Sequence, residues 1–145
     1  MRGHNIWPLA ALAAALVMLP GCSSASAVAG GPDAARLVSV AGSDRPQVLL
    51  TDIAAARLGI KTDQVKAAVA PMLSIPVTAL LYDKNGATWV YVSPSPLTYQ
   101  RQPVTVARIA GNTAPLQSGP AVGTAVVTVG AAELLGAEFG VAGGQ

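Results

Sequence analysis

Apolar side chains in this chain form one long block near the start and short runs after it. Residues 9–19 have the sequence LAALAAALVML, without a charged or hydroxyl-bearing side chain. The later apolar runs are separated by turn residues, such as those at 42–46 (GSDRP) and 110–113 (AGNT). Short runs of this kind, some alternating with polar positions, are typical of β-strands. The pattern therefore predicts an apolar N-terminal segment followed by a mainly β domain.

The expected fold is a small β-roll or sandwich of about seven short strands with one short helix. Two of the strands form a hairpin within residues 77–92. The other strands are expected at residues 36–40, 47–50, 60–69, 98–109 and 125–129.

The helix is expected at residues 52–58. Thr51 can accept a hydrogen bond from an amide of the first turn, and Gly59 suits the left-handed residue that ends a helix. Ile53 and Leu58 are the expected apolar anchors of this helix. Residues 131–136 (AAELLG) are a candidate for one further helical turn.

The hairpin carries most of the aromatic side chains of the expected domain. Asn85-Gly86 is a favoured pair for a two-residue turn, because both positions need positive φ. A turn at this point pairs Tyr82 with Trp89 and places Tyr91 on the same face of the hairpin. These three rings are either a partner-binding surface or part of the core of the domain.

The apolar block at residues 9–19 has the properties of an export signal. It follows a short segment that carries Arg2 and no acidic residue. It is too short to span a membrane, which takes about 20 apolar residues, but it matches the apolar core of a signal peptide. A buried helix is the alternative, although Pro20-Gly21 would end such a helix at once.

The residues that follow, Leu19-Pro20-Gly21-Cys22, resemble the lipobox of bacterial lipoprotein precursors. That resemblance implies cleavage before Cys22, which receives the lipid, and places the protein on the extracytoplasmic side of a membrane. We therefore divide the chain into a signal peptide at 1–21, a flexible tether at 22–34, a β domain at 35–140 and a flexible tail at 141–145. The alternative is a secreted protein with a free thiol.

The chain offers few side chains for catalysis or metal binding. Its one cysteine forms no internal disulfide, and its one histidine, His4, lies in the expected signal peptide. Met72 is the one methionine after residue 21, and no G-x-S-x-G motif occurs. Asp52 and Asp83 have structural explanations, at a helix start and beside a turn. We expect no catalytic, cofactor or metal site and no enzymatic activity.

Charge indicates no nucleic-acid partner, since Lys and Arg exceed Asp and Glu by only two. Arg101 and Arg108 lie in the strand expected at 98–109. They either bind acidic groups or occupy solvated positions at the edge of the sheet.

The C-terminal half contains IPVTAL at 75–80, TWVYV at 88–92 and PVTV at 103–106, followed by a Gly-rich stretch around Val126-Val127. In this order the segments resemble the membrane-proximal region of periplasmic adaptor subunits, the membrane fusion proteins of resistance-nodulation-division efflux pumps. Residues 47–65 are similar to the segment that leads into such adaptors. The resemblance implies a module built from strands of both ends of the chain, acting as an accessory to a transmembrane transporter.

The chain also departs from that family. Members place a lipoyl-like domain, an α-helical hairpin and a β-barrel between the two matching parts, whereas here only residues 66–74 lie between them. Pro120 and Thr124 stand where the family usually has leucine and aspartate. The resemblance thus implies a miniature adaptor. The alternative is a solitary lipoprotein that binds envelope polymers or another protein and has no role in transport.

Overall fold

The computed structural model describes residues 33–140. The expected signal peptide at 1–21, the expected lipid-attachment residue Cys22, the expected tether up to residue 32 and the expected tail at 141–145 lie outside the described residues. Between residues 33 and 140, no helix is long and apolar enough to cross a membrane.

The described residues form ten β-strands, two α-helices and one 3-10 turn, so the expectation of a mainly β domain is confirmed. Ten strands replace the expected seven, partly because two of them are only two residues long. The elements in chain order are β1 (Ala35–Val38), β2 (Gln47–Leu50), α1 (Asp52–Leu58), β3 (Lys61–Gln64), β4 (Lys66–Ala67), β5 (Leu73–Pro76), the 3-10 turn (Val77–Ala79), β6 (Leu81–Tyr82), β7 (Thr88–Ser95), β8 (Thr98–Val106), β9 (Thr113–Ser118), β10 (Ala125–Val129) and α2 (Ala131–Glu138).

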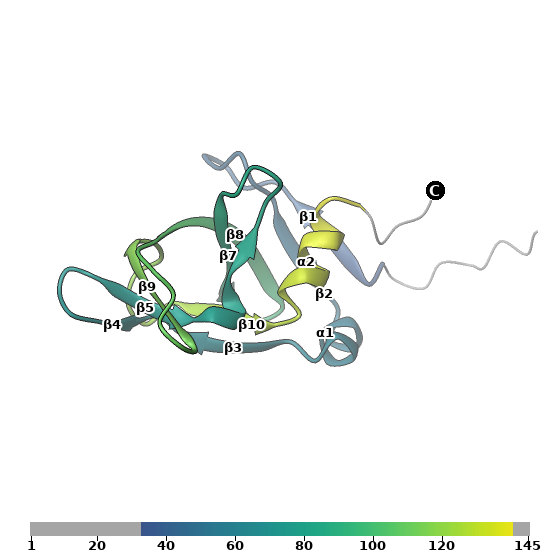
Figure 1. The fold of residues 1–145 in the computed structure, drawn as a ribbon. Coiled ribbons are helices and arrows are strands. Elements are labelled where there is room, and N and C mark those ends of the chain that lie inside the picture. The colour runs from purple at the N-terminus through teal and green to yellow at the C-terminus, as the bar shows by residue number, and fades with distance from the viewer. Residues whose placement is uncertain (1–32, 141–145) are drawn as a thin grey trace, which may run out of the picture.

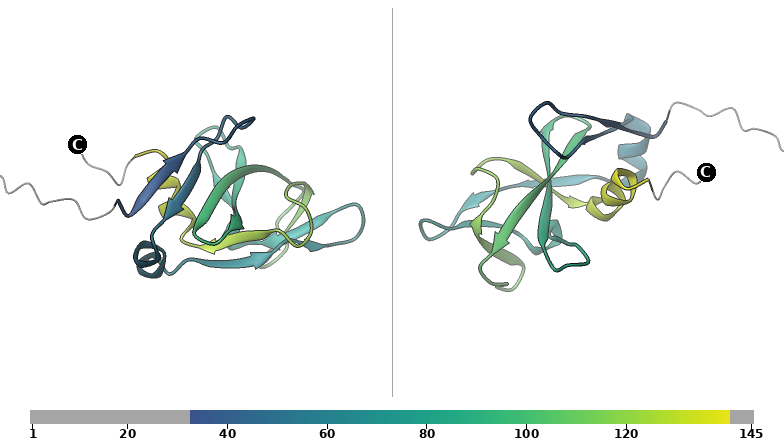
Figure 2. Two further views of the ribbon diagram at one scale, coloured as in Figure 1. Left: turned by 180° about the vertical axis from the view of Figure 1, so that it is seen from behind. Right: turned by 90° about the horizontal axis from the view of Figure 1, so that it is seen from above.

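The strands form one antiparallel, barrel-like sheet that is nearly closed (Figure 1). Its main path runs β3-β10-β7-β8-β9-β5-β4, with β6 paired to β7 and the β1–β2 hairpin paired to β8. Strand β8 pairs with three neighbours: β2 near its start, β7 along most of its length from Thr98 to Val104, and β9 at its end. Both ends of the described chain lie on the same side of the molecule, beside β1 and α2 (Figures 1 and 2).

Strands from the two ends of the chain complete each other's sheet. Strand β2 pairs with β8, with Val48 opposite Tyr99, and β3 pairs with β10, with Asp63 opposite Val126. A sheet needs several strands with a common apolar face to be stable, and neither end of the chain supplies enough by itself. The N-terminal and C-terminal parts therefore fold as one unit.

The apolar side chains divide into two clusters on the two sides of β7. Val90 and Val92 belong to a cluster inside the barrel, together with side chains such as Ile75 and Leu116. Tyr91 belongs to a second cluster, between the sheet and the two helices. Because β7 is covered on both sides, consecutive residues at its centre are all buried, which explains its apolar sequence.

Helix α1 begins and ends where the sequence predicts. The Thr51 hydroxyl accepts a hydrogen bond from the amide of Ala54 at 3.2 Å, and Gly59 has a left-handed conformation with φ of 61°. Of the two expected anchors, Leu58 packs against the core, but Ile53 needs correction. Ala54 is the buried residue of this helix, whereas Ile53 is 65% exposed. The candidate helical turn near the C-terminus is a full helix, α2, which Gly130 precedes with φ of 88°.

The hairpin turn has three residues instead of the expected two. Its ends are held by a hydrogen bond from the amide of Asp83 to the carbonyl of Ala87, and Gly86 takes a left-handed conformation with φ of 82°. The Asp83 carboxylate also accepts hydrogen bonds from the amides of Asn85 and Ala87, at 2.8 and 2.9 Å. A tight turn with Gly at its left-handed position is a common hairpin connection, and it shifts the register by one residue.

That shift overturns the predicted pairing of Tyr82 with Trp89. Tyr82 lies opposite Thr88, and Trp89 lies opposite Leu81. Because successive side chains alternate between the faces of a sheet, a one-residue shift moves a side chain to the other face. The expected common face is therefore wrong: Trp89 and Tyr91 share one face of the hairpin, and Tyr82 is on the other.

Candidate functional site

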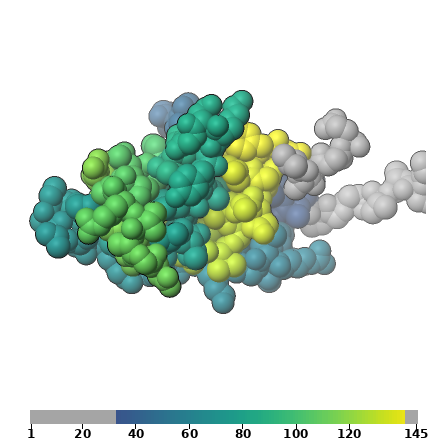
Figure 3. Space-filling view, viewed as in Figure 1, coloured from purple at the N-terminus to yellow at the C-terminus, as the bar shows by residue number. Residues whose placement is uncertain are grey.

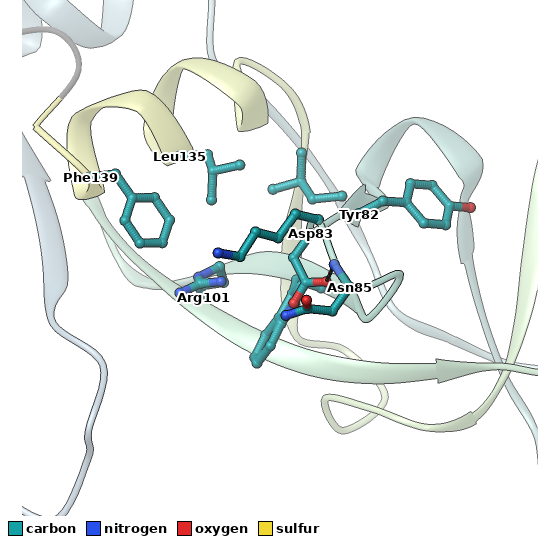
Figure 4. Close-up of a pocket in the computed structure, with 9 residues that line it drawn as sticks. Tyr82, Asp83, Asn85, Arg101, Leu135 and Phe139 are labelled. Carbon is teal, nitrogen blue, oxygen red and sulfur yellow. Dashed lines mark hydrogen bonds between the residues drawn. The ribbon is translucent and has the colours of Figure 1, made fainter.

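A cleft of about 480 Å³ lies between the β6–β7 turn and helix α2. Leu81, Tyr82 and Lys84 contribute to it from the turn side, and Leu135 and Phe139 from the helix side. Trp89 lines it from β7 and Arg101 from β8. Figure 4 shows Arg101 between the turn, with Asp83 and Asn85, and the helix side, with Leu135 and Phe139. In the space-filling view the turn and the helix stand next to each other on one face of the molecule (Figure 3).

Trp89 is held in place by three polar groups. The guanidinium groups of Arg45 and Arg101 lie over its ring, with their central carbons 4.5 and 4.6 Å from the ring centroid. Its indole nitrogen donates a hydrogen bond of 3.3 Å to the Asp83 carboxylate. Cation–π contacts and a hydrogen bond to the ring N–H both restrict the orientation of a tryptophan. The ring is thus a fixed part of the cleft.

The carboxyl group of Asp83 is the negatively charged group beside Trp89. Burial acts to raise the pKa of its carboxyl, but the hydrogen bonds from the two turn amides and the Trp89 indole outweigh that effect and lower the pKa below its usual value. The carboxylate is therefore ionised at neutral pH. One carboxylate oxygen accepts hydrogen bonds from the turn amides and the other accepts one from the Trp89 indole, so Asp83 connects the turn to Trp89.

Glu138, in the last turn of α2, links the helix to the sheet through polar contacts with Arg101 and Tyr91. Both of its oxygens accept hydrogen bonds from Arg101, from Nε at 3.1 and 3.2 Å and from Nη2 at 3.0 Å. The Tyr91 hydroxyl donates a further hydrogen bond to it. Two-pronged arginine–carboxylate pairs are strong and geometrically specific. The pair also offsets the unfavourable position of a carboxylate at a helix C-terminus.

The same arrangement keeps Tyr91 neutral. Burial of the phenol, followed by its hydrogen bond to the Glu138 carboxylate, raises the pKa of the hydroxyl far above its usual range. Tyr91 therefore acts as a permanent donor to Glu138 and is no acid or base near neutral pH.

The three predicted partner-binding residues have different environments. Tyr82 is 59% exposed, at the rim of the cleft, and Trp89 is half-buried. Tyr91 is fully buried and lies behind the cleft, in the cluster beneath the helices. Its assignment to a binding surface is therefore corrected: Tyr91 supports the site through Glu138 and is not accessible to a partner.

The sequence prediction left the partners of three important residues unidentified. Arg101 was expected either to bind an acidic group or to lie at a solvated edge; it pairs with Glu138 and also contacts the rings of Trp89 and Phe139, the latter at 5.1 Å. Glu138 and Phe139 follow the segment predicted as a helical turn, and the sequence assigned no partner to either. Arg108, in contrast, is exposed.

The lining of the cleft combines apolar and aromatic side chains with a few charged groups. Its walls are mainly apolar and aromatic, the carboxylate of Asp83 is occupied by hydrogen bonds, and Lys84 supplies an exposed cation. Within residues 33–140, no group of three His, Cys, Asp or Glu side chains is placed to hold a metal ion. The chain matches no family model, and comparison with curated proteins and with solved structures also found no match.

Proposed function

We propose that this protein is a lipid-anchored, adaptor-like module that docks on the extracytoplasmic face of a transmembrane transporter. The observation that carries the proposal is the interleaving of the two chain ends. Of the segments that resemble adaptors, residues 47–65 supply β2 and β3, and the C-terminal half supplies β8 and β10. Strand β2 pairs with β8, and β3 pairs with β10. A module of this kind closes its own core without the middle domains of a long adaptor.

The cleft beside α2 is the proposed docking surface. Exposed aromatic side chains border it, Tyr82 at 59% and Phe139 at 62%, and aromatic residues dominate the energetics of protein interfaces. Lys84 at its edge favours an acidic group on the partner. A lipid anchor raises the local concentration of the domain beside a membrane protein, so a small interface suffices for binding.

The anchor itself is tested by Cys22→Ser. This change removes the thiol that would carry the lipid, so we expect the protein to leave the membrane fraction and to lose all incorporation of a labelled fatty acid. Fractionation and labelling of cells that express each form measure the two effects. Equal labelling of the two forms would contradict the assignment of Cys22.

Docking is tested with a photo-crosslinking aromatic residue in place of Tyr82, whose ring reaches solvent. We expect a discrete adduct with an integral membrane protein, and we expect Phe139→Ala to reduce it because that ring forms the opposite wall. Val69, which is 86% exposed and is not a cleft residue, is the matched control position for the crosslinker.

The same experiment separates the proposal from a solitary lipoprotein. Adducts of equal intensity from positions 82 and 69 would contradict a specific docking surface. Adducts only with envelope polymers or soluble proteins would favour the solitary lipoprotein and overturn the transport role.

A further inference from the structure

A second, larger hollow lies between α1 and α2, on the other side of the helical end of the domain. Its volume is about 700 Å³, within the range of small-molecule binding sites. Leu50, Ile53 and Leu58 line it from β2 and α1, and Gly136 and Ala137 line it from α2. This groove is apolar along its walls, and Ile53 leaves much of its side chain in water at its edge.

The charged side chains of the groove lie on its exposed border. Arg57 and Glu133 are both exposed lining residues, and the exposed Arg36 lines an adjoining hollow that shares Leu50 with the groove. The carboxylates of Glu133 and Asp33 lie on the same border, so it carries both signs of charge. The apolar walls suit a hydrocarbon chain, and Arg36 and Arg57 suit anionic headgroups close to it.

The groove opens where the described chain begins. Ala34 and Ala35 form part of its wall, and both ends of the described chain lie on this side of the molecule (Figure 2). Cys22 precedes Ala34 by twelve residues in the sequence. Twelve residues reach at most about 40 Å, which is ample for a group on Cys22 to return to the groove.

We propose that the groove between α1 and α2 binds one acyl chain of the lipid on Cys22. This inference rests on the proposed lipid anchor. A lipoprotein anchor has more than one acyl chain, so one chain enters the groove while the others stay in the bilayer. The bound chain holds the α1–α2 end of the domain against the membrane, with Arg36 and Arg57 toward the headgroups, and thereby orients the cleft beside Tyr82.

The chemistry of the groove favours an acyl chain over a peptide. A peptide carries backbone N–H and C=O groups that need hydrogen-bond partners when they are buried. Of the lining side chains, only Thr51, Arg57 and Glu133 can form hydrogen bonds. The Thr51 hydroxyl already accepts one from Ala54, and Arg57 and Glu133 lie at the exposed border, whereas an acyl chain requires no such partner. The C-terminal tail at 141–145 (VAGGQ), the nearest peptide candidate in the sequence, contributes one branched aliphatic side chain.

The test uses the full chain in bacteria fed a fatty acid that carries a diazirine and an alkyne. Alkyne detection before irradiation reports acylation of Cys22. Irradiation followed by proteolysis and mass spectrometry reports which residues the acyl chain touches. We expect a crosslink between the Cys22 peptide and peptides that contain α1 or α2 residues of the same molecule.

Gly136→Phe is the variant that fills the groove. A Cβ built on Gly136 meets no atom within 4 Å, so a side chain fits there, and replacing a helical glycine also favours the helix. We expect the crosslink to fall to the level of an unirradiated sample. Ala56→Phe adds the same ring to an exposed residue of α1 outside the groove and should leave the crosslink unchanged. Ile53→Asp, at an exposed position, is a second blocking variant that puts charge at the groove edge.

Each outcome separates the inference from the anchor on which it rests. Acylation of Cys22 with no crosslink to α1 or α2 would leave the anchor in place and overturn the groove assignment. A groove crosslink that persists in Cys22→Ser would mean that a membrane lipid occupies the groove, which overturns the proposed occupant. Loss of acylation from the wild-type chain would overturn both proposals.

Discussion

Replacing Glu138 with alanine is expected to lower the free energy of unfolding by about 3 kcal/mol, as is typical when one partner of a buried ion pair is removed. The side chains of Arg101 and Glu138 are only 12% and 5% exposed. Without the carboxylate, the guanidinium and the Tyr91 hydroxyl lose their shared partner in a place that water reaches poorly. Helix α2 has eight residues, too few to be stable without packing against the sheet. Loss of the Glu138 contacts weakens that packing and so destabilises the helix as well.

Urea unfolding of a chain that starts at Asp33 measures this effect. Glu133→Ala is the matched control, because Glu133 lies in the same helix, is exposed and forms no ion pair in the described part of the chain. The control should change stability by about 0.5 kcal/mol or less. In the double variant with Arg101→Ala, the loss should be smaller than the sum of the single losses. Additive losses would show that the pair does not couple the helix to the sheet.

Gly130→Ala is expected to cost about 3 kcal/mol, from two sources that add. Gly130 precedes α2 with φ of 88°, a conformation that side chains with a Cβ rarely adopt. A Cβ at this position would also lie 2.2 Å from Cδ1 of Ile60, which packs against the cluster beneath the helices. Either the helix start or the Ile60 side chain must move.

Gly86→Ala separates these two sources. Gly86 has nearly the same backbone, with φ of 82°, but a Cβ there meets no atom within 4 Å. Its expected cost is therefore the backbone strain alone, about 1 to 2 kcal/mol. Thermal unfolding of both variants gives the comparison. An equal loss of stability in the two would mean that Ile60 moves aside freely and that the contact at Gly130 contributes nothing.

The local elements of this domain were largely predictable, because their signals lie within a few neighbouring residues. Thr51 and Gly59 delimit α1 through a hydroxyl acceptor and a left-handed glycine, and both act as predicted. Strands β2 and β10 have the predicted bounds. The apolar sequence on both faces of β7 correctly indicated a strand that is covered on both sides.

The hairpin register was not predictable in the same way. A sequence with Asn85-Gly86 is compatible with a two-residue turn and with a three-residue turn that has Gly at its end. The structure has the second, in which Asp83 binds two turn amides and the indole of Trp89. Trp89 is in turn held by Arg45, which lies more than forty residues away in the sequence. A contact between residues so far apart in the sequence cannot be predicted from the local pattern of apolar and polar residues.

By itself, the sequence determined the mainly β fold, the position of α1 and the apolar character of both faces of β7, since periodicity and capping act over short distances. Only the tertiary structure decided which aromatic rings face solvent and what surrounds the cleft. Tyr91 and Tyr82 differ in burial because a one-residue shift in pairing exchanges the faces of a strand. Arg101 meets Glu138 across 37 residues of chain, and such a pairing arises only when β8 and α2 are packed together.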